Sequence, residues 1–335
     1  MNGGALPGRR DESFRWSDLS RILRAVPPAS PPALAPGWPG PFEGLADREM
    51  IFVNGFEDGP DLALLGDEVV AARFISDAHD TGHLARLKVQ VMAGASAVLL
   101  ESYEGRGDKY FANTVLDIEL GVGASLERIV VLDEPDGAVS VSTAQVRLAE
   151  GSHYAQTVAA SGARLQRHET HVHHPGGGAT ARLDAVYLLD GARHTDITTI
   201  VVHEGLEGET SQLAKGVVGG SARGVFQGKI VVSHGADKTD ARMRHDALLL
   251  SDKAEVDAKP ELEIYADDVS CAHGNTVGAL DEEALFYARA RGMPLAVATA
   301  MLTQAFVAEA VDRVGHEMAR EALRGWTGRR LEALS

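Results

Sequence analysis

Cysteine is nearly absent from this sequence, since Cys271 is the only one among 335 residues. A single thiol cannot form a disulfide within the chain, which excludes the disulfide-rich secreted class. No apolar run approaches the roughly eighteen residues of a membrane span, and the N-terminus lacks the apolar core of a secretory signal. We therefore expect a soluble, cytoplasmic protein that does not enter a membrane.

Aromatic residues are also scarce, at 5% of the chain, whereas glycine is abundant at 36 residues. Glycine thus makes up about 11% of the sequence, against an average near 7%. This composition predicts many turns between short strands whose core is filled by aliphatic residues. The formal net charge of −16 argues against a nucleic-acid-binding surface, which needs a basic face.

Three common enzyme motifs are missing. The sequence contains no GxxxxGKS/T phosphate-binding loop, no GxSxG nucleophile turn, and no GxGxxG that leads from a strand into a helix. Nucleotide hydrolysis through a phosphate-binding loop and dinucleotide-dependent redox chemistry therefore have no residues to support them.

Alternation of apolar and polar residues begins near residue 50 and continues to about residue 270. Period-two runs of four to eight residues, separated by Gly, Asp and Ser, are typical of strands. The clearest runs are 87–91, 115–120, 139–142, 181–189, 196–202 and 228–232. No convincing amphipathic helix separates them. A sandwich, a barrel or a parallel β-helix fits this pattern, and the length weakly favours the solenoid.

Both ends of the chain have helical patterns. Residues 19–26 have apolar residues at helical spacing, and the seven prolines between 27 and 41 predict an extended linker. Near the other end, Asp281 suits a helix N-cap, Gly292 a left-handed C-cap and Pro294 the first turn of the next helix. One side of that last helix is expected to carry Leu295, Leu302, Phe306 and Arg313.

Cys271 stands two positions before His273, so their side chains share a face if the segment is a strand. Thiolate and imidazole ligands suit iron or zinc. An iron–sulfur cluster normally takes about four cysteines, which indicates a site shared with another subunit. For Cys271 alone we favour the alternative, a small buried hydrophobic residue.

Two carboxylates precede this pair. On a strand Asp267 and Asp268 would point to opposite faces, so they would not share a proton. One of them, Asp268 in our assignment, could orient the His273 ring as a hydrogen-bond acceptor. Gly274 then places His273 at a turn that leaves the sheet.

Residues 264–292 resemble the C-terminal signature of the SufD members of the SufB/SufD family, ADDVxCxHGATVGxL followed by LFYxxSRG. The chain differs at Asn275, where the family usually has Ala, and at Ala290, where it usually has Ser. The segments 6–19 and 224–241 resemble further motifs of the family. Gly274 distinguishes the chain from SufB members, which read HExxxSKI at this place.

The resemblance implies a mainly β fold with a right-handed parallel β-helix core over 46–278. A short N-terminal helical segment with a Pro-rich linker would occupy 1–45, and a larger C-terminal helical segment 279–335. It further implies a non-catalytic scaffold subunit of the SUF iron–sulfur cluster assembly complex. This subunit would pair with a SufB-like paralogue through the β-helix and bind a SufC-like ATPase through the C-terminal helices.

The resemblance also assigns the site. His273, with Cys271, would recruit iron or ligate a nascent iron–sulfur cluster that is shared with the partner. We expect no iron or cluster bound tightly to the isolated chain, which could form a homodimer. His194 and His203 match histidines of a family motif, and their role stays open between site residues and β-helix packing; His194 could also pair with Asp196 on one strand face.

Two alternatives remain. A stand-alone metal-binding protein could use His168, His171, His173 and His174, although a solvated hairpin end with adventitious metal affinity explains them equally well. A β-helix enzyme that cleaves carbohydrates would need clustered acidic and aromatic residues, and the low aromatic content disfavours it.

Overall fold

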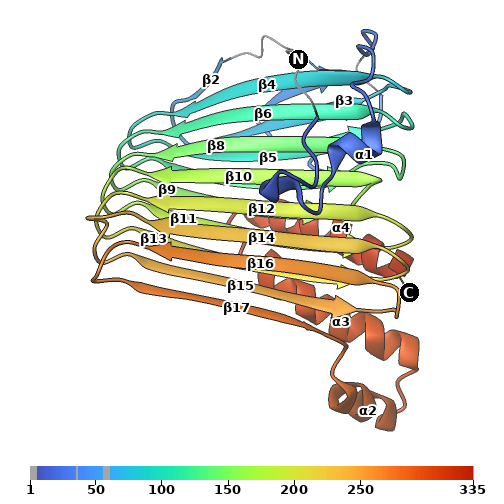
Figure 1. Cartoon of the computed structure of the whole chain (residues 1–335). Coiled ribbons are helices and arrows are strands. Elements are labelled where there is room, and N and C mark those ends of the chain that lie inside the picture. The colour runs from blue at the N-terminus through green and yellow to red at the C-terminus, as the bar shows by residue number, and fades with distance from the viewer. Residues whose placement is uncertain (1–5, 35–36, 56–60, 335) are drawn as a thin grey trace.

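The computed structural model describes residues 6–34, 37–55 and 61–334. In these ranges the chain winds into a parallel β-helix with a nine-stranded and an eight-stranded sheet. Successive strands alternate between the two sheets, so that β3, β5 and β7 are neighbours in one and β4, β6 and β8 in the other (Figure 1). The mainly β, parallel β-helix prediction is confirmed.

The nine-stranded sheet contains β1 (Arg48–Val53), β3 (Glu68–Ser76), β5 (Ser96–Gly105), β7 (Ser125–Asp133), β9 (His153–Ala160), β11 (Thr180–Leu189), β13 (Glu209–Val218), β15 (Asp240–Leu249) and β17 (Ser270–Gly278). The eight-stranded sheet contains β2 (Asp61–Leu64), β4 (Gly82–Val91), β6 (Phe111–Leu120), β8 (Val139–Leu148), β10 (Leu165–His174), β12 (His194–His203), β14 (Arg223–Val232) and β16 (Glu255–Ile264).

The space between the sheets, which we call the lumen, holds the main hydrophobic core. Aliphatic side chains stack in register from strand to strand, as where Leu87 of β4 lies beside Leu116 of β6, both fully buried. Tight corners join the sheets and explain the glycine content. One residue in each of four successive corners has φ between 62° and 69°, a region that glycine enters without strain, namely Gly94, Gly123, Gly151 and Gly178.

A buried polar layer interrupts this core. Arg128 of β7 donates two hydrogen bonds of 2.7 Å to Glu101 of β5, and neither side chain is exposed. The remaining guanidinium nitrogen donates to Gln156 of β9 at 2.8 Å, and the Tyr103 hydroxyl donates to Glu101. Every charge in the layer is therefore matched, as burial in an apolar lumen requires.

The N-terminal segment crosses the outer face of the eight-stranded sheet (Figure 1). It contains the 3₁₀ turn η1 (Glu12–Phe14) and the helix α1 (Leu19–Leu23), whose Leu19 is buried against Val139 and Leu165. The described part of the segment 27–41 has no helix, as the prolines predict, while residues 35 and 36 lie outside the described residues.

Three helices follow the β-helix, namely α2 (Glu282–Ala290), α3 (Leu295–Val311) and α4 (Glu317–Leu334). The predicted caps are confirmed, because Asp281 accepts hydrogen bonds from the amides of Glu283 and Ala284 and Gly292 has φ 87°. The predicted stripe on α3 is confirmed only in part, because Phe306 packs against the core on the sheet but Arg313 lies beyond Val311, where the helix ends. The buried side chains of α3 are Ala298, Thr303, Val307, Ala310 and Val311, whereas Leu295 is exposed.

The arrangement of these helices explains that difference. α3 and α4 cover the outer face of the nine-stranded sheet, and α2 projects beyond the last strand (Figure 1). Ala310 and Val311 are fully buried against the sheet, whereas the larger Phe306 packs against the same cluster and stays partly exposed. No helix in the described ranges is long and apolar enough to cross a membrane.

Candidate functional site at the open end of the β-helix

The C-terminal end of the β-helix is open. β16 pairs only with β14, and β17 only with β15, so each is the last strand of its sheet. The free edge of β17 presents backbone N–H and C=O groups that have no strand partner within the described structure. Such an edge readily pairs with a strand of another chain.

Register shows which side chains of β17 face the lumen. Cys271, His273 and Asn275 lie beside Ala241, Met243 and His245 of β15, all of which are buried. Cys271 packs against the lumen core, whereas His273 is exposed because no further turn covers it. The thiol and the imidazole therefore lie on the same side, about 7 Å apart along the strand.

The expectations for the neighbouring residues need correction. His273 lies inside β17 and not at a turn leaving the sheet. Asp267 and Asp268 lie in the bend between β16 and β17, because the chain must cross from one sheet to the other there, so neither is part of a strand. In the described structure neither carboxylate forms a hydrogen bond with His273; the Asp268 carbonyl accepts from the Lys238 amide instead.

The described residues bring few metal-ligating side chains together at the open end. Among the described residues no group of three or more His, Cys, Asp and Glu could hold a metal ion. Burial raises the pKa of the Cys271 thiol, so the thiolate that would bind metal is disfavoured until the environment changes. Of the two candidate metal ligands on β17, His273 is the exposed one, so it is the ligand that a second subunit could contact.

Sequence reasoning missed a hydrogen-bonded chain behind His273. His245 of β15 lies in the lumen, where its Nδ1–H donates to the Asn275 side-chain oxygen at 2.6 Å. Its Nε2 accepts from the Tyr187 hydroxyl at 2.7 Å, and the ring stacks on Phe226 at 4.9 Å. Burial lowers the pKa of His245, which keeps the ring neutral for this pattern. Asn275, at a position where the family usually has Ala, was the sequence signal that could have indicated a hydrogen-bond partner in the lumen.

The histidines of residues 168–174 do not converge on one site. They lie on β10, a central strand and not a hairpin end, and successive side chains point to opposite sides. His168 and His174 face the lumen and are buried, whereas His171 and His173 face outward and pair with Glu169 and Glu204. The geometry therefore gives no support to a metal site built from these four residues.

His194 and His203 lie at opposite ends of β12, two strands from the end of the sheet. His203 faces the lumen, where its ring lies against that of His174 with centroids 4.3 Å apart and the two planes tilted by 33°. Burial lowers the pKa of His174 to about 3 and that of His203 to about 4. Neither His194 nor His203 reaches β17, so neither is close to His273.

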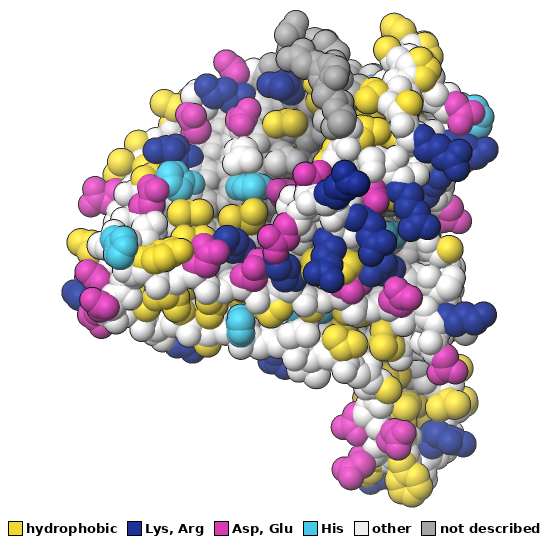
Figure 2. Space-filling model, viewed as in Figure 1, with side chains coloured by type: hydrophobic (Ala, Val, Ile, Leu, Met, Phe, Trp, Pro, Cys, Tyr) yellow, Lys and Arg dark blue, Asp and Glu magenta, His cyan; other side chains and the backbone are white. Residues whose placement is uncertain are grey.

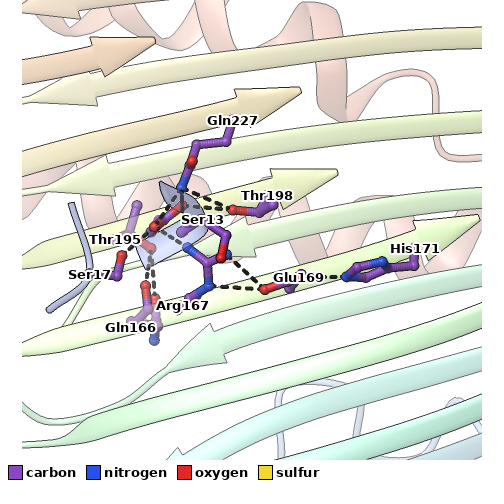
Figure 3. Close-up of polar contacts among 10 residues, drawn as sticks. Ser13, Ser17, Gln166, Arg167, Glu169, His171, Thr195, Thr198 and Gln227 are labelled. Carbon is purple, nitrogen blue, oxygen red and sulfur yellow. Dashed lines mark hydrogen bonds and ion pairs between the residues drawn. The ribbon is translucent and has the colours of Figure 1, made fainter. Parts of the chain in front are cut away.

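The predicted His194–Asp196 pair does not form. Asp196 is fully buried and instead accepts a 2.6 Å hydrogen bond from Arg167, together with bonds from Gln227 and from Ser17 of the N-terminal segment (Figure 3). Arg167 also donates to Glu169, whose other oxygen meets His171. Burial raises the pKa of Glu169, but His171 and Arg167 outweigh that effect and lower it to about 2. This network fastens the N-terminal segment to the sheet.

Comparison with known proteins identifies the architecture. Residues 74–306 match the model of the family described as SUF system FeS cluster assembly, SufBD core domain. The chain is 32% identical over 263 residues to the iron–sulfur cluster assembly protein SufD of Escherichia coli, covering 78% of this chain and 61% of that protein. It is 31% identical over 238 residues to a SufBD family protein of Synechocystis, covering 68% and 52% of the two chains.

A third relative, the chloroplastic protein ABCI7 of Arabidopsis thaliana, is 29% identical over 242 residues, which cover 71% of this chain and 51% of that protein. The chain thus spans between about half and three fifths of the length of these relatives. The family match itself covers most of the β-helix and the start of the C-terminal helices. The chain therefore belongs to the SufBD core family of the SUF system and is of the SufD type.

Proposed function

We propose that the chain is a non-catalytic scaffold subunit in SUF iron–sulfur cluster assembly. The observation that carries this proposal is the open end of the β-helix, where the terminal strand β17 presents Cys271 and His273 on its lumen side. The relatives from Escherichia coli and Synechocystis named above are described as iron–sulfur cluster assembly proteins. The cluster is the cargo of such a scaffold, and His273 is its first ligand or iron-recruiting base on this chain.

The open end supports pairing with a SufB-like paralogue. Besides the free edge of β17, it exposes apolar side chains that a second β-helix would cover, such as Ile264 at 42% and Tyr265 at 52% exposed. The partner supplies the cysteines that this chain lacks, so the cluster forms between the two subunits. A shared site also accounts for the small number of ligands on β17.

The C-terminal helices support docking of a SufC-like ATPase. α2 projects from the body, and its Phe286 and Tyr287 are 74% and 61% exposed (Figure 1). Leu295, Val297 and Met301 at the start of α3 extend this apolar surface. Because α2 follows β17 after three residues, a force on α2 acts directly on the strand that carries His273.

Anaerobic co-purification from the cytoplasm tests the pairing. The tagged chain should recover a cysteine-bearing paralogue and an ABC-type ATPase in stoichiometric amounts. Ile264→Asp with Val277→Asp should abolish recovery of the paralogue, because charges would be buried at the open end. The matched control, Leu65→Asp with Val122→Asp, changes exposed apolar residues elsewhere and should leave recovery intact. Recovery of the chain alone would refute the proposal.

Phe286→Asp separates the two partners. It should remove the ATPase while the paralogue stays bound, since Phe286 lies on α2 and outside the β-helix. Loss of both partners, or of neither, would contradict the assignment of the ATPase to the C-terminal helices.

A further inference from the structure

The N-terminal segment concentrates positive charge on an acidic protein. Arg9, Arg10, Arg15, Arg21 and Arg24 are exposed, and Arg164 beside them donates to the carbonyl of Ile22 at 3.3 Å. We call these six residues the arginine cluster. Figure 2 shows Lys and Arg side chains gathered on the face where this segment crosses the eight-stranded sheet. The whole chain, in contrast, has a net charge of −16.

The carboxylates of the segment do not neutralise the arginine cluster. Within the described structure none of the six guanidinium groups forms an ion pair. Asp18 caps α1 by accepting from the Arg21 amide at 3.0 Å, and Asp11 accepts from the Gly8 amide. Glu12 pairs with Lys259 of β16 at 2.8 Å. Arg15 lies over the Trp16 ring at 5.4 Å and Arg164 donates to a backbone carbonyl, but neither contact supplies a negative charge. Like charges held near one another without a counter-charge are unfavourable for the isolated chain, which favours binding of an anionic partner.

The segment that carries the arginine cluster is held against the sheet by buried contacts. Ser17 is buried and donates to Asp196, while the Phe14 ring lies 4.5 Å from the Arg167 guanidinium carbon. Leu19 packs into the apolar cluster on the sheet. These contacts determine where the arginines project, so little conformational entropy is lost when they bind.

The surrounding charge decides which kind of partner fits. On this sheet face Glu261 and Glu263 of β16 pair with Lys259 and Lys229 at 3.1 and 2.7 Å. Asp117 and Glu119 of β6 are exposed and form no ion pair within the described structure, so they leave negative charge on this face. An extended phosphate backbone would cross these carboxylates and be repelled. A short run of protein carboxylates can remain within the cluster, and guanidinium groups bind carboxylates in a bidentate manner.

We infer that the arginine cluster is a docking surface for an acidic segment of another protein, independent of the open end where β17 lies. It is a second interaction surface, which would allow an acidic protein segment to bind while the open end is occupied. Steering between a local positive patch and an acidic partner raises the association rate and makes it sensitive to salt.

The test uses the full chain and a fluorescein-labelled peptide of ten glutamates, followed by fluorescence anisotropy at 50 and 200 mM salt. Arg9→Gln, Arg10→Gln and Arg21→Gln combined should weaken binding at least tenfold and flatten its salt dependence. The matched control, Lys253→Gln, Arg289→Gln and Arg329→Gln, removes the same charge from exposed residues outside the eight-stranded sheet and should change binding less than twofold. Leu19→Ala, which removes no charge, should also weaken binding because it loosens the support.

Three outcomes would overturn the inference. Equal weakening by the control variant would show that only net charge matters. Tighter binding of a ten-nucleotide single-stranded DNA, lost in the cluster variant, would make nucleic acid the partner class. Concentration-dependent self-association that disappears in the cluster variant would make a second copy of the chain the occupant. None of these outcomes bears on the pairing through β17, so this inference and the scaffold proposal fail separately.

Discussion

The Nδ1–H of His245 donates a 2.6 Å hydrogen bond to the side-chain oxygen of Asn275, joining the buried lumen to the exposed terminal strand. His245 is held from its other side by Tyr187 and Phe226. Because Asn275 lies two residues after His273 on the same face, this bond fixes the part of β17 that we assign to cluster assembly.

Asn275→Ala should therefore loosen β17. The substitution leaves the His245 N–H without its protein partner, at a cost of about 1 kcal/mol in the free energy of unfolding. Amide hydrogen exchange across β17 should accelerate, while exchange in β13 and β15 should stay unchanged. Asn275→Asp keeps the accepting oxygen and serves as the control; if it accelerates exchange as much as Asn275→Ala, the hydrogen bond is not what holds the strand.

Glu101→Gln tests the buried polar layer. It would leave Arg128 charged and unmatched in the lumen, and loss of one member of a buried ion pair typically costs about 3–5 kcal/mol. Urea unfolding should show this loss. Replacing both residues, Glu101→Leu with Arg128→Met, should cost much less, because no charge stays buried. A single variant as stable as the native chain would contradict the buried pair.

His174 makes stability depend on pH. Its pKa is about 3 in the folded chain because of burial, against an ordinary value near 6.5 in the unfolded chain. The unfolded state therefore takes up a proton first as the pH falls below about 6.5, and folding is weakened by about 1.4 kcal/mol per pH unit towards pH 3.

His174→Leu should remove the contribution of one titrating group to the pH dependence of the free energy of unfolding. The free energy of unfolding would be measured by urea unfolding at pH 7 and at pH 5. Between these two pH values the native chain should lose about 2 kcal/mol more stability than the His174→Leu chain. Leu65→Ala, an exposed position without a titratable group, is the control and should leave the slope unchanged. An equal slope in the His174 variant would show that its imidazole titrates normally in the folded chain.

Gly216 and Gly274 both lie within strands, but an added Cβ would meet different surroundings at the two positions. A Cβ at Gly216 would overlap the ring of Tyr187, so Gly216→Ala should cost about 1–3 kcal/mol and disturb the Tyr187–His245 bond. Gly274, in contrast, meets nothing within 4 Å and has no left-handed backbone, so Gly274→Ala should be nearly neutral. Urea midpoints of the two variants would measure the difference, and equal losses would contradict it.

The sequence predicted where the strands lie, but the alternation alone did not predict which strands become neighbours. The runs 87–91, 115–120 and 228–232 all lie within strands, because period-two alternation reflects one lumen face and one outer face. Periodicity did not select the β-helix, which came from the family resemblance. The reason is physical: a parallel strand in a solenoid and a strand in a sandwich have the same local pattern, and they differ only in which strand becomes the neighbour.

The site residues show the same limit. Cys271 and His273 could be placed on one face from their spacing, but their position at an open end depends on β17 being the last strand. The partner of Asn275 lies thirty residues earlier in the chain, so the His245–Asn275 bond depends on the length of one complete turn. The histidines of β10 looked like one cluster because the sequence does not show that the lumen wall separates them.

Iron and acid-labile sulfide on the anaerobically purified complex test the central claim most directly. The complex of this chain with its SufB-like and SufC-like partners should hold a cluster, and His273→Ala should lower the cluster content at least tenfold while the complex stays assembled. Thr276→Ala, on the opposite face of β17, should have no effect, and the isolated chain should hold far less than one iron. Full cluster content in the His273→Ala complex, or stoichiometric iron and sulfide on the isolated chain, would contradict the account.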